Sequence, residues 1–130
     1  MATLEHVNIT VPDPLATADM LAEVFGWHIR WQSSAMGGLG HSVHVGTDDS
    51  YLAVYSGTGP LTPAQPDGSY SSVVGLNHVG VMVDDLDATE RAVTARGYAT
   101  HSHADYEPGR RFYFHDENGV EFEVVSYNAA

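Results

Sequence analysis

Two segments of the chain show the same alternation of apolar and polar residues. In "HVNITV", residues 6–11, the apolar Val7, Ile9 and Val11 share one face, and the polar His6, Asn8 and Thr10 share the other. In the segment "HVGVMV", residues 78–83, every second residue is a valine, and His78, Gly80 and Met82 share the opposite face. A period of two predicts a β-strand in each place, with its valine face toward a helix and the other face toward a cavity or solvent.

Each of these strands is followed by a segment with helical features. Asp13 is a good N-cap, Pro14 fits the first helical position, and an apolar stripe runs on to Gly26. In the second copy Asp85 or Asp87 could cap the helix, and Gly97 ends it. Three more strand-like runs then close each copy, at 27–33, 41–46 and 51–56, and at 98–103, 110–116 and 120–127.

The two copies align without a gap over residues 4–24 and 76–96, at an offset of 72 residues. Similarity at one fixed offset indicates a repeated structural unit. We therefore predict one domain over 1–130, with repeat one at about 4–56, a linker at about 57–75 and repeat two at about 76–127. The linker is rich in Pro, Gly and Ser, and it either covers a cleft or is a plain surface connection.

The charge of the chain limits its partners. Seventeen acidic residues face five arginines and no lysine, which gives a net charge of −12. Such a chain should repel nucleic acids and anionic membranes and attract cationic ligands, although the more ordinary interpretation is that the acidity serves solubility alone. There is no cysteine, and we find neither a membrane-length apolar run nor a signal peptide, so we expect a cytoplasmic protein without disulfides.

The polar faces of the strands suggest a metal site. His6 and His78 occupy equivalent positions of the repeat, and the alternation in "VEFEVV" leaves Glu121 and Glu123 on the face opposite the core. Two histidines and one carboxylate form a ligand set that suits iron(II), with manganese, zinc and nickel as alternatives. A single histidine on a strand is usually an ordinary surface residue. The repeat-equivalent pair together with Glu123 makes ligation the better interpretation.

The segments "LEHVNITV", "LNHVGVMVDDLDAT" and "GRRFYFHDENGVEFEVVSY" together resemble the vicinal oxygen chelate superfamily. This group contains glyoxalase I, extradiol dioxygenases, fosfomycin-resistance enzymes and bleomycin-resistance proteins. The resemblance implies an α+β fold in which two βαβββ repeats pair into an open, curved, eight-stranded mixed sheet around a shared cavity. It also implies that His6, His78 and Glu123 are the metal ligands.

The resemblance extends to other residues around the expected site. Tyr113 corresponds to a tyrosine that lines the site of extradiol dioxygenases, and we expect it to hydrogen-bond to the substrate. Ala53 stands where glyoxalase I and related epimerases usually carry a carboxylate, which argues against an isomerase mechanism. Arg110 and Arg111 provide little positive charge for binding the phosphonate of fosfomycin. The expected substrate-binding residues are Arg111, His44, Tyr51, Tyr55 and Asn8, whereas His28, His41, His101 and His103 have no assigned partner.

Two functions remain open at this stage. The first is a metal-dependent enzyme, dioxygenase-like or glyoxalase/lyase-like, that binds a small substrate through two adjacent oxygens. The second is a protein of the bleomycin-resistance type that sequesters a cationic small molecule without catalysis. The complete ligand set favours the enzyme, and the acidity favours the binding protein. The resemblance further implies a homodimer.

Overall fold

The structure is a computed structural model, and it describes residues 1–33, 40–63, 68–106 and 109–127. The chain divides into two compact units, Met1–Thr62 and Pro63–Ala130. The boundary lies within the range 57–75, of which residues 64–67 are outside the described part. None of the helices in the described residues has the length and hydropathy to cross a membrane.

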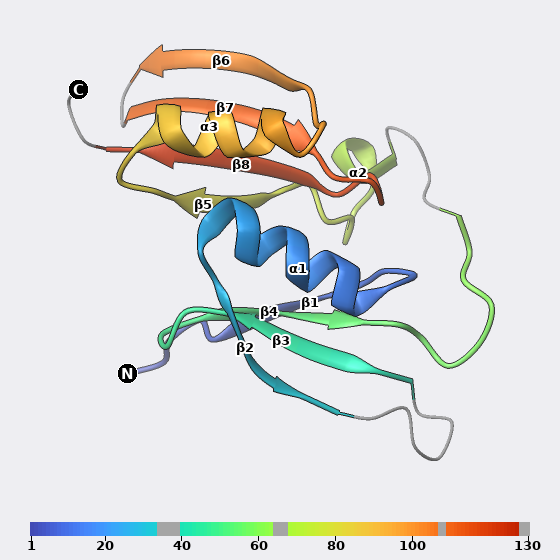
Figure 1. Cartoon of the computed structure of the whole chain (residues 1–130). Coiled ribbons are helices and arrows are strands. Elements are labelled where there is room, and N and C mark those ends of the chain that lie inside the picture. The colour runs from blue at the N-terminus through green and yellow to red at the C-terminus, as the bar shows by residue number, and fades with distance from the viewer. Residues whose placement is uncertain (34–39, 64–67, 107–108, 128–130) are drawn as a thin grey trace. The chain divides into compact units, whose positions relative to one another are not determined.

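The first unit is a βαβββ unit built on one mixed sheet (Figure 1). Its strand order is β1-β4-β3-β2, with β1 parallel to β4 and the other neighbours antiparallel. Its elements are β1 (His6–Thr10), α1 (Pro14–Phe25), β2 (His28–Gln32), β3 (Ser42–Gly46) and β4 (Tyr51–Tyr55).

The second unit repeats this topology in the order β5-β8-β7-β6, with β5 parallel to β8. A short helix, α2, precedes the repeat and was not predicted. The α+β class and the two βαβββ repeats are confirmed, and the pairing of the two sheets around one cavity stays a prediction. The elements are α2 (Gly68–Ser71), β5 (Val79–Met82), α3 (Leu86–Ala95), β6 (Thr100–Tyr106), β7 (Gly109–His115) and β8 (Glu121–Ser126).

Both main helices begin and end where the sequence indicates. Asp13 and Asp85 are the N-caps, and each side chain accepts a hydrogen bond from the backbone N–H three residues later. Pro14 occupies the first turn of α1, and Gly26 ends this helix with φ +72°, in the left-handed region that glycine enters without strain. Gly97, just after α3, has φ +98°. The caps thus fix the helix ends locally.

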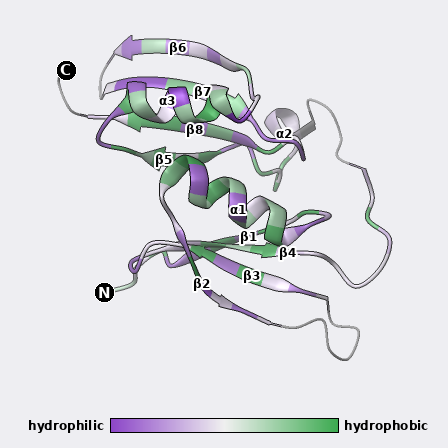
Figure 2. Ribbon diagram, viewed as in Figure 1, coloured by the Kyte–Doolittle hydropathy of each residue, from purple (hydrophilic) through white to green (hydrophobic). Residues whose placement is uncertain are grey.

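Each helix packs on the later three strands of its own unit, which buries one face of the sheet. In the first unit Leu21 and Val43 are fully buried, whereas Val7 on the edge strand β1 keeps 38% of its surface exposed. In the second unit Phe112, Phe114 and Phe122 are fully buried, and the rings of Phe114 and Phe122 stack at 5.1 Å. Figure 2 shows hydrophobic and hydrophilic positions alternating along α1 and the strands. The uncovered faces of the sheets therefore carry the polar side chains.

Candidate functional site

The uncovered face of the second unit gathers titratable side chains from three strands. On β7 the buried Phe112 and Phe114 alternate with the less buried Arg111, Tyr113 and His115. The register of β7 and β8 places Tyr113 opposite Glu123 and His115 opposite Glu121. Since strand side chains alternate between faces, these residues share the face away from α3.

His78 and Glu123 are direct partners on this face. The Nε2 atom of His78 lies 3.0 Å from Oε1 of Glu123. The other ring nitrogen, Nδ1, lies 2.8 Å from Oδ1 of Asn77, which as a carbonyl oxygen can only accept a hydrogen bond. With its proton on Nδ1, the ring would present Nε2 to the carboxylate as a nitrogen that a metal ion could share with Oε1.

Arg111 anchors the other oxygen of Glu123. Its Nη1 donates to Oε2 at 2.7 Å, and the two side chains are only 11% and 14% exposed. Burial alone would lower the pKa of Arg111, but the hydrogen bond and the charge of Glu123 raise it above its ordinary value. The guanidinium also lies 4.7 Å from the centre of the Tyr106 ring. Glu123 is thus held in one orientation, with Oε1 turned toward His78.

Tyr113 completes this group. Its ring meets the ring of His78 edge-on at 5.6 Å and stacks on His101 at 6.1 Å. Burial, followed by a hydrogen bond to Glu123, raises the pKa of Tyr113. The phenol therefore keeps its proton at neutral pH and can donate it in a hydrogen bond. The structure brings together four residues that the sequence suggested for one site: His78, Glu123, Tyr113 and Arg111.

The uncovered face of the first unit carries a second group of predicted residues. Oε1 of Glu5 lies 2.9 Å from Nδ1 of His6 and accepts a hydrogen bond from the Tyr51 hydroxyl at 3.2 Å. These hydrogen bonds lower the pKa of Glu5. His6 stacks on Tyr51 at 4.9 Å, and His44 stacks on the same ring at 4.5 Å. His6, His44 and Tyr51 therefore form a continuous aromatic surface.

The neighbours of this surface are also defined by the sheet. The register pairs Ala53 with Asn8 on one side and with His44 on the other, and Ala53 is only 2% exposed. Tyr55 ends β4 opposite Thr10 and Ser42. Burial, together with the charges of His6 and Arg30, lowers the pKa of His44. His44 is therefore neutral at pH 7, and its ring can contact a flat ligand without adding charge.

The two candidate histidines are oriented in the same way. Glu5 and Asn77 occupy equivalent positions of the 72-residue repeat, and each provides an oxygen to Nδ1 of the histidine that follows it. Both histidines therefore have Nε2 available as a ligand atom. The sequence analysis did not assign roles to Glu5 and Asn77, although their position before each histidine was visible. How His6 lies with respect to His78 and Glu123 stays a prediction.

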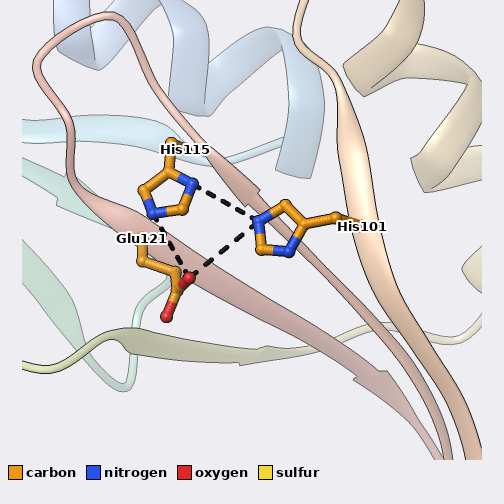
Figure 3. Close-up of side chains that lie close together, drawn as sticks. All are labelled: His101, His115 and Glu121. Carbon is orange, nitrogen blue, oxygen red and sulfur yellow. Dashed lines mark hydrogen bonds and ion pairs between the residues drawn. The ribbon is translucent and has the colours of Figure 1, made fainter. Parts of the chain in front are cut away.

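A further cluster was missed as a set. His101 on β6, His115 on β7 and Glu121 on β8 point toward one another (Figure 3). The sequence could have predicted that His115 lies opposite Glu121, because a short hairpin joins their two strands. It could not have predicted the position of His101, because a register shift between His101 and Ala104 changes the direction of β6.

The comparisons with known proteins agree with the fold. A family model described as "Glyoxalase/Bleomycin resistance protein/Dioxygenase superfamily" matches residues 3–124. The chain belongs to this superfamily. The resemblance seen in the sequence is thereby confirmed. No curated protein matches this sequence.

Solved structures of the superfamily's fold superpose on nearly the whole chain. One is the fosfomycin resistance protein FosX from Mesorhizobium loti, with 22% identity, a TM-score of 0.73, and 99% of this chain and 94% of that one covered. Another is TnmS3, an antibiotic binding protein from Streptomyces sp. CB03234, with 20% identity, a TM-score of 0.72, and 97% and 96% covered.

A third structure is a glutamate-to-glutamine variant of FosX from Listeria monocytogenes, complexed with Mn(II) and 1S,2S-dihydroxypropylphosphonic acid. It shares 16% identity with this chain at a TM-score of 0.73, with 99% and 92% of the two chains covered. At these identities the three likenesses establish the fold. They include both metal-bound and antibiotic-binding proteins, so the function has to be argued from the site itself.

Proposed function

We propose that this chain is a metal-dependent enzyme of the superfamily that acts on a small oxygenated substrate through two adjacent oxygens. The observation that carries the proposal is the 3.0 Å contact between Nε2 of His78 and Oε1 of Glu123, with Nδ1 of the same ring held by Asn77. Two atoms bound at about 2.0–2.2 Å to one ion lie roughly 3 Å apart. The contact therefore has the length that shared coordination needs.

The donor set fits a divalent ion of the borderline class. We propose that His6, oriented by Glu5, provides the third ligand, and that iron(II), manganese, nickel or zinc is the ion. When bound, such an ion supplies Lewis-acid chemistry that stabilises negative charge on substrate oxygens. The Mn(II) in the FosX complex supports a divalent metal in this superfamily, without selecting one here.

The remaining residues have roles that follow from their contacts. Arg111 holds Glu123 in place and balances its charge at 2.7 Å, so the carboxylate keeps one oxygen for ligation. Tyr113, a protonated phenol beside His78, is proposed to donate a hydrogen bond to the substrate. His44, Tyr51, Tyr55 and Asn8 are proposed to line the binding surface for a flat ligand on the first unit.

Titration of chelator-treated protein with each ion tests the metal part of the proposal. A bound ion should raise the midpoint of thermal unfolding, because binding at 100 times Kd stabilises the folded state by about 2.7 kcal/mol. Glu123→Gln should lose the part of this response that comes from the proposed site, whereas Glu121→Gln, on the same face of the same strand, should keep that part. An unchanged response in Glu123→Gln would reject the site.

Activity then separates the reaction classes. Oxygen uptake with catechols by the iron(II)-loaded protein, abolished in Glu123→Gln, would support a dioxygenase. A reaction that needs zinc, nickel or manganese and consumes no oxygen would support glyoxalase- or lyase-like chemistry. Ala53 is small and buried, and it cannot act as a fourth ligand. This favours reaction classes that need no carboxylate at that position.

The net charge favours a second candidate, a protein that sequesters a cationic small molecule without catalysis. The aromatic surface of His6, His44 and Tyr51 would serve such a ligand equally well, and TnmS3 is an antibiotic binding protein of the same fold. A cationic glycopeptide that raises the unfolding midpoint equally with and without metal would support this function. A response that depends on metal would support the enzyme.

We also propose that the protein is a cytoplasmic homodimer that binds neither nucleic acid nor membranes. Its acidity supports the last two points, since phosphate contacts need basic residues. Light scattering coupled to size-exclusion chromatography gives the mass of the assembly, and a value near the 14.0 kDa of one chain would contradict the dimer.

A further inference from the structure

The cluster of His101, His115 and Glu121 has the composition and spacing of a second metal site. Oε2 of Glu121 lies 3.2 Å from Nε2 of His115 and 3.9 Å from Nε2 of His101, and Nε2 of His101 lies 3.3 Å from Nδ1 of His115. One ligand atom from each residue falls within 4.8 Å of the others. Ligands of a tetrahedral ion with bonds of about 2.0–2.2 Å are roughly 3.3 Å apart. The two short contacts of His115 use different ring nitrogens, so coordination requires this ring to turn until one nitrogen faces both partners.

The ligand atoms are oriented by neighbours outside the cluster. Nδ1 of His101 lies 2.9 Å from the hydroxyl of Ser102, which can accept its proton and leave Nε2 free. Ser102 has φ +57°, unusual for a residue other than glycine, and it lies in the bulge that redirects His101 toward β7. The strained backbone and the hydrogen bond together hold His101 in place.

Glu121 is oriented from its other side. The Tyr70 hydroxyl donates a short hydrogen bond to Oε1, which leaves Oε2 for the two histidines. This hydrogen bond, followed by burial, raises the pKa of Tyr70 to about 12, so Tyr70 remains a donor. The Glu121 side chain is 11% exposed, whereas those of His101 and His115 are 39% and 51% exposed. The cluster is therefore open to an ion from solvent and firmly held at its carboxylate.

We propose that His101, His115 and Glu121 bind a divalent ion of the zinc class, independently of the site at His78 and Glu123. The two imidazoles favour zinc, nickel, copper or cobalt over magnesium and calcium, which prefer oxygen ligands. Each residue contributes one ligand atom, and water completes the coordination. The two sites are neighbours, because the Tyr70 hydroxyl also lies 3.4 Å from Nδ1 of His78.

Zinc titration of untagged, chelator-treated protein against a chromophoric chelator tests this proposal. Glu121→Gln and His115→Ala should each lower the zinc affinity of this site by about 100-fold or more, because each removes a direct ligand. Loss of a residue that only orients a ligand already lowers metal affinity by about 10–100-fold. Tyr70→Phe, which removes such a residue, should lower the affinity by about 10-fold or more. Glu123→Gln and His28→Ala are the controls and should retain zinc binding at this site.

A readout of the side chains guards against a folding defect in a variant. In ¹⁵N spectra of the wild type, the imidazole signals of His101 and His115 should shift as this zinc binds, while those of His28, in the other unit, stay in place. Equal zinc binding by wild type, Glu121→Gln and His115→Ala would overturn the second site. Absence of zinc binding by the wild type would overturn it as well. Loss confined to Glu123→Gln would assign all the binding to the first site instead.

Discussion

Replacing Arg111 with methionine tests whether Glu123 depends on a buried ion pair. The pair has an Nη1–Oε2 distance of 2.7 Å and side chains that are 11% and 14% exposed. Removing one partner of a buried pair costs about 3–5 kcal/mol, because the other charge stays buried without compensation. Residual exposure and the neighbouring His78 reduce the expected cost to about 2–3 kcal/mol. Methionine keeps an apolar stem against Tyr106, so little of this cost comes from lost packing.

Native-state hydrogen exchange of the β7 and β8 amides is the appropriate assay. Trp27 and Trp31 both lie in the first unit, so tryptophan fluorescence would report on the wrong half of the chain. Exchange resolves the free energy of opening for each strand separately. The variant should lower this free energy in β7 and β8 and leave that of β3 and β4 unchanged.

The double variant Arg111→Met/Glu123→Gln provides the control, because it removes both charges of the pair. It should recover most of the stability lost in Arg111→Met. A loss below about 0.5 kcal/mol in the single variant, the size of an ordinary surface substitution, would refute the reasoning. So would a double variant that is as unstable as the sum of the two single variants.

Three further predictions follow from the core, a helix cap and a titrating group. Phe114→Ala should lower the free energy of unfolding by about 3–5 kcal/mol, measured by denaturant and circular dichroism, because the ring is fully buried against Phe122; a loss under about 1 kcal/mol would contradict the packing. Asp13→Ala should cost about 1 kcal/mol in the same measurement through the lost N-cap, whereas Asp19→Ala, exposed within the helix, should cost less. The pKa of His44 is lowered from 6.5 in the folded state, so the unfolded chain binds this proton more readily. The stability of the first unit should therefore be complete above pH 6.5 and fall below it, and tryptophan fluorescence should detect a smaller fall in His44→Gln; equal falls would contradict the shift.

Local features made much of the fold predictable from the sequence. Asp13 with Pro14 and Gly26 determine the ends of α1 by hydrogen bonding and backbone preference alone. The alternation of Phe112 and Phe114 with Tyr113 likewise assigns the two faces of β7. These effects act over a few residues and therefore leave a clear pattern.

Features that depend on several strands were less visible. That His78 and Glu123 share a face was predictable, because the alternation along each strand puts both residues opposite the core. Their 3.0 Å contact was not, since the register pairs Glu123 with Gly80. The position of His101 was not predictable, because it depends on a bulge at Ser102. Ser102 has a positive φ, which a serine in the sequence does not indicate. The hydrogen bond from Arg111 to Glu123 was not predicted either, because it depends on which charges share a face. A contact of Arg111 with the substrate stays a prediction.

Metal content of protein purified without a histidine tag, measured by mass spectrometry, tests the central claim most directly. Wild type should hold one divalent ion per chain more than Glu123→Gln or His78→Ala, because these variants lose the ion proposed for His6, His78 and Glu123. Glu121→Gln should keep this ion and lose only the one proposed for the second site. The identity of the ion that Glu123→Gln loses would also narrow the reaction class. If neither wild type nor Glu123→Gln held metal after reconstitution with iron, manganese, nickel and zinc, or if both held it equally, the claim would be contradicted.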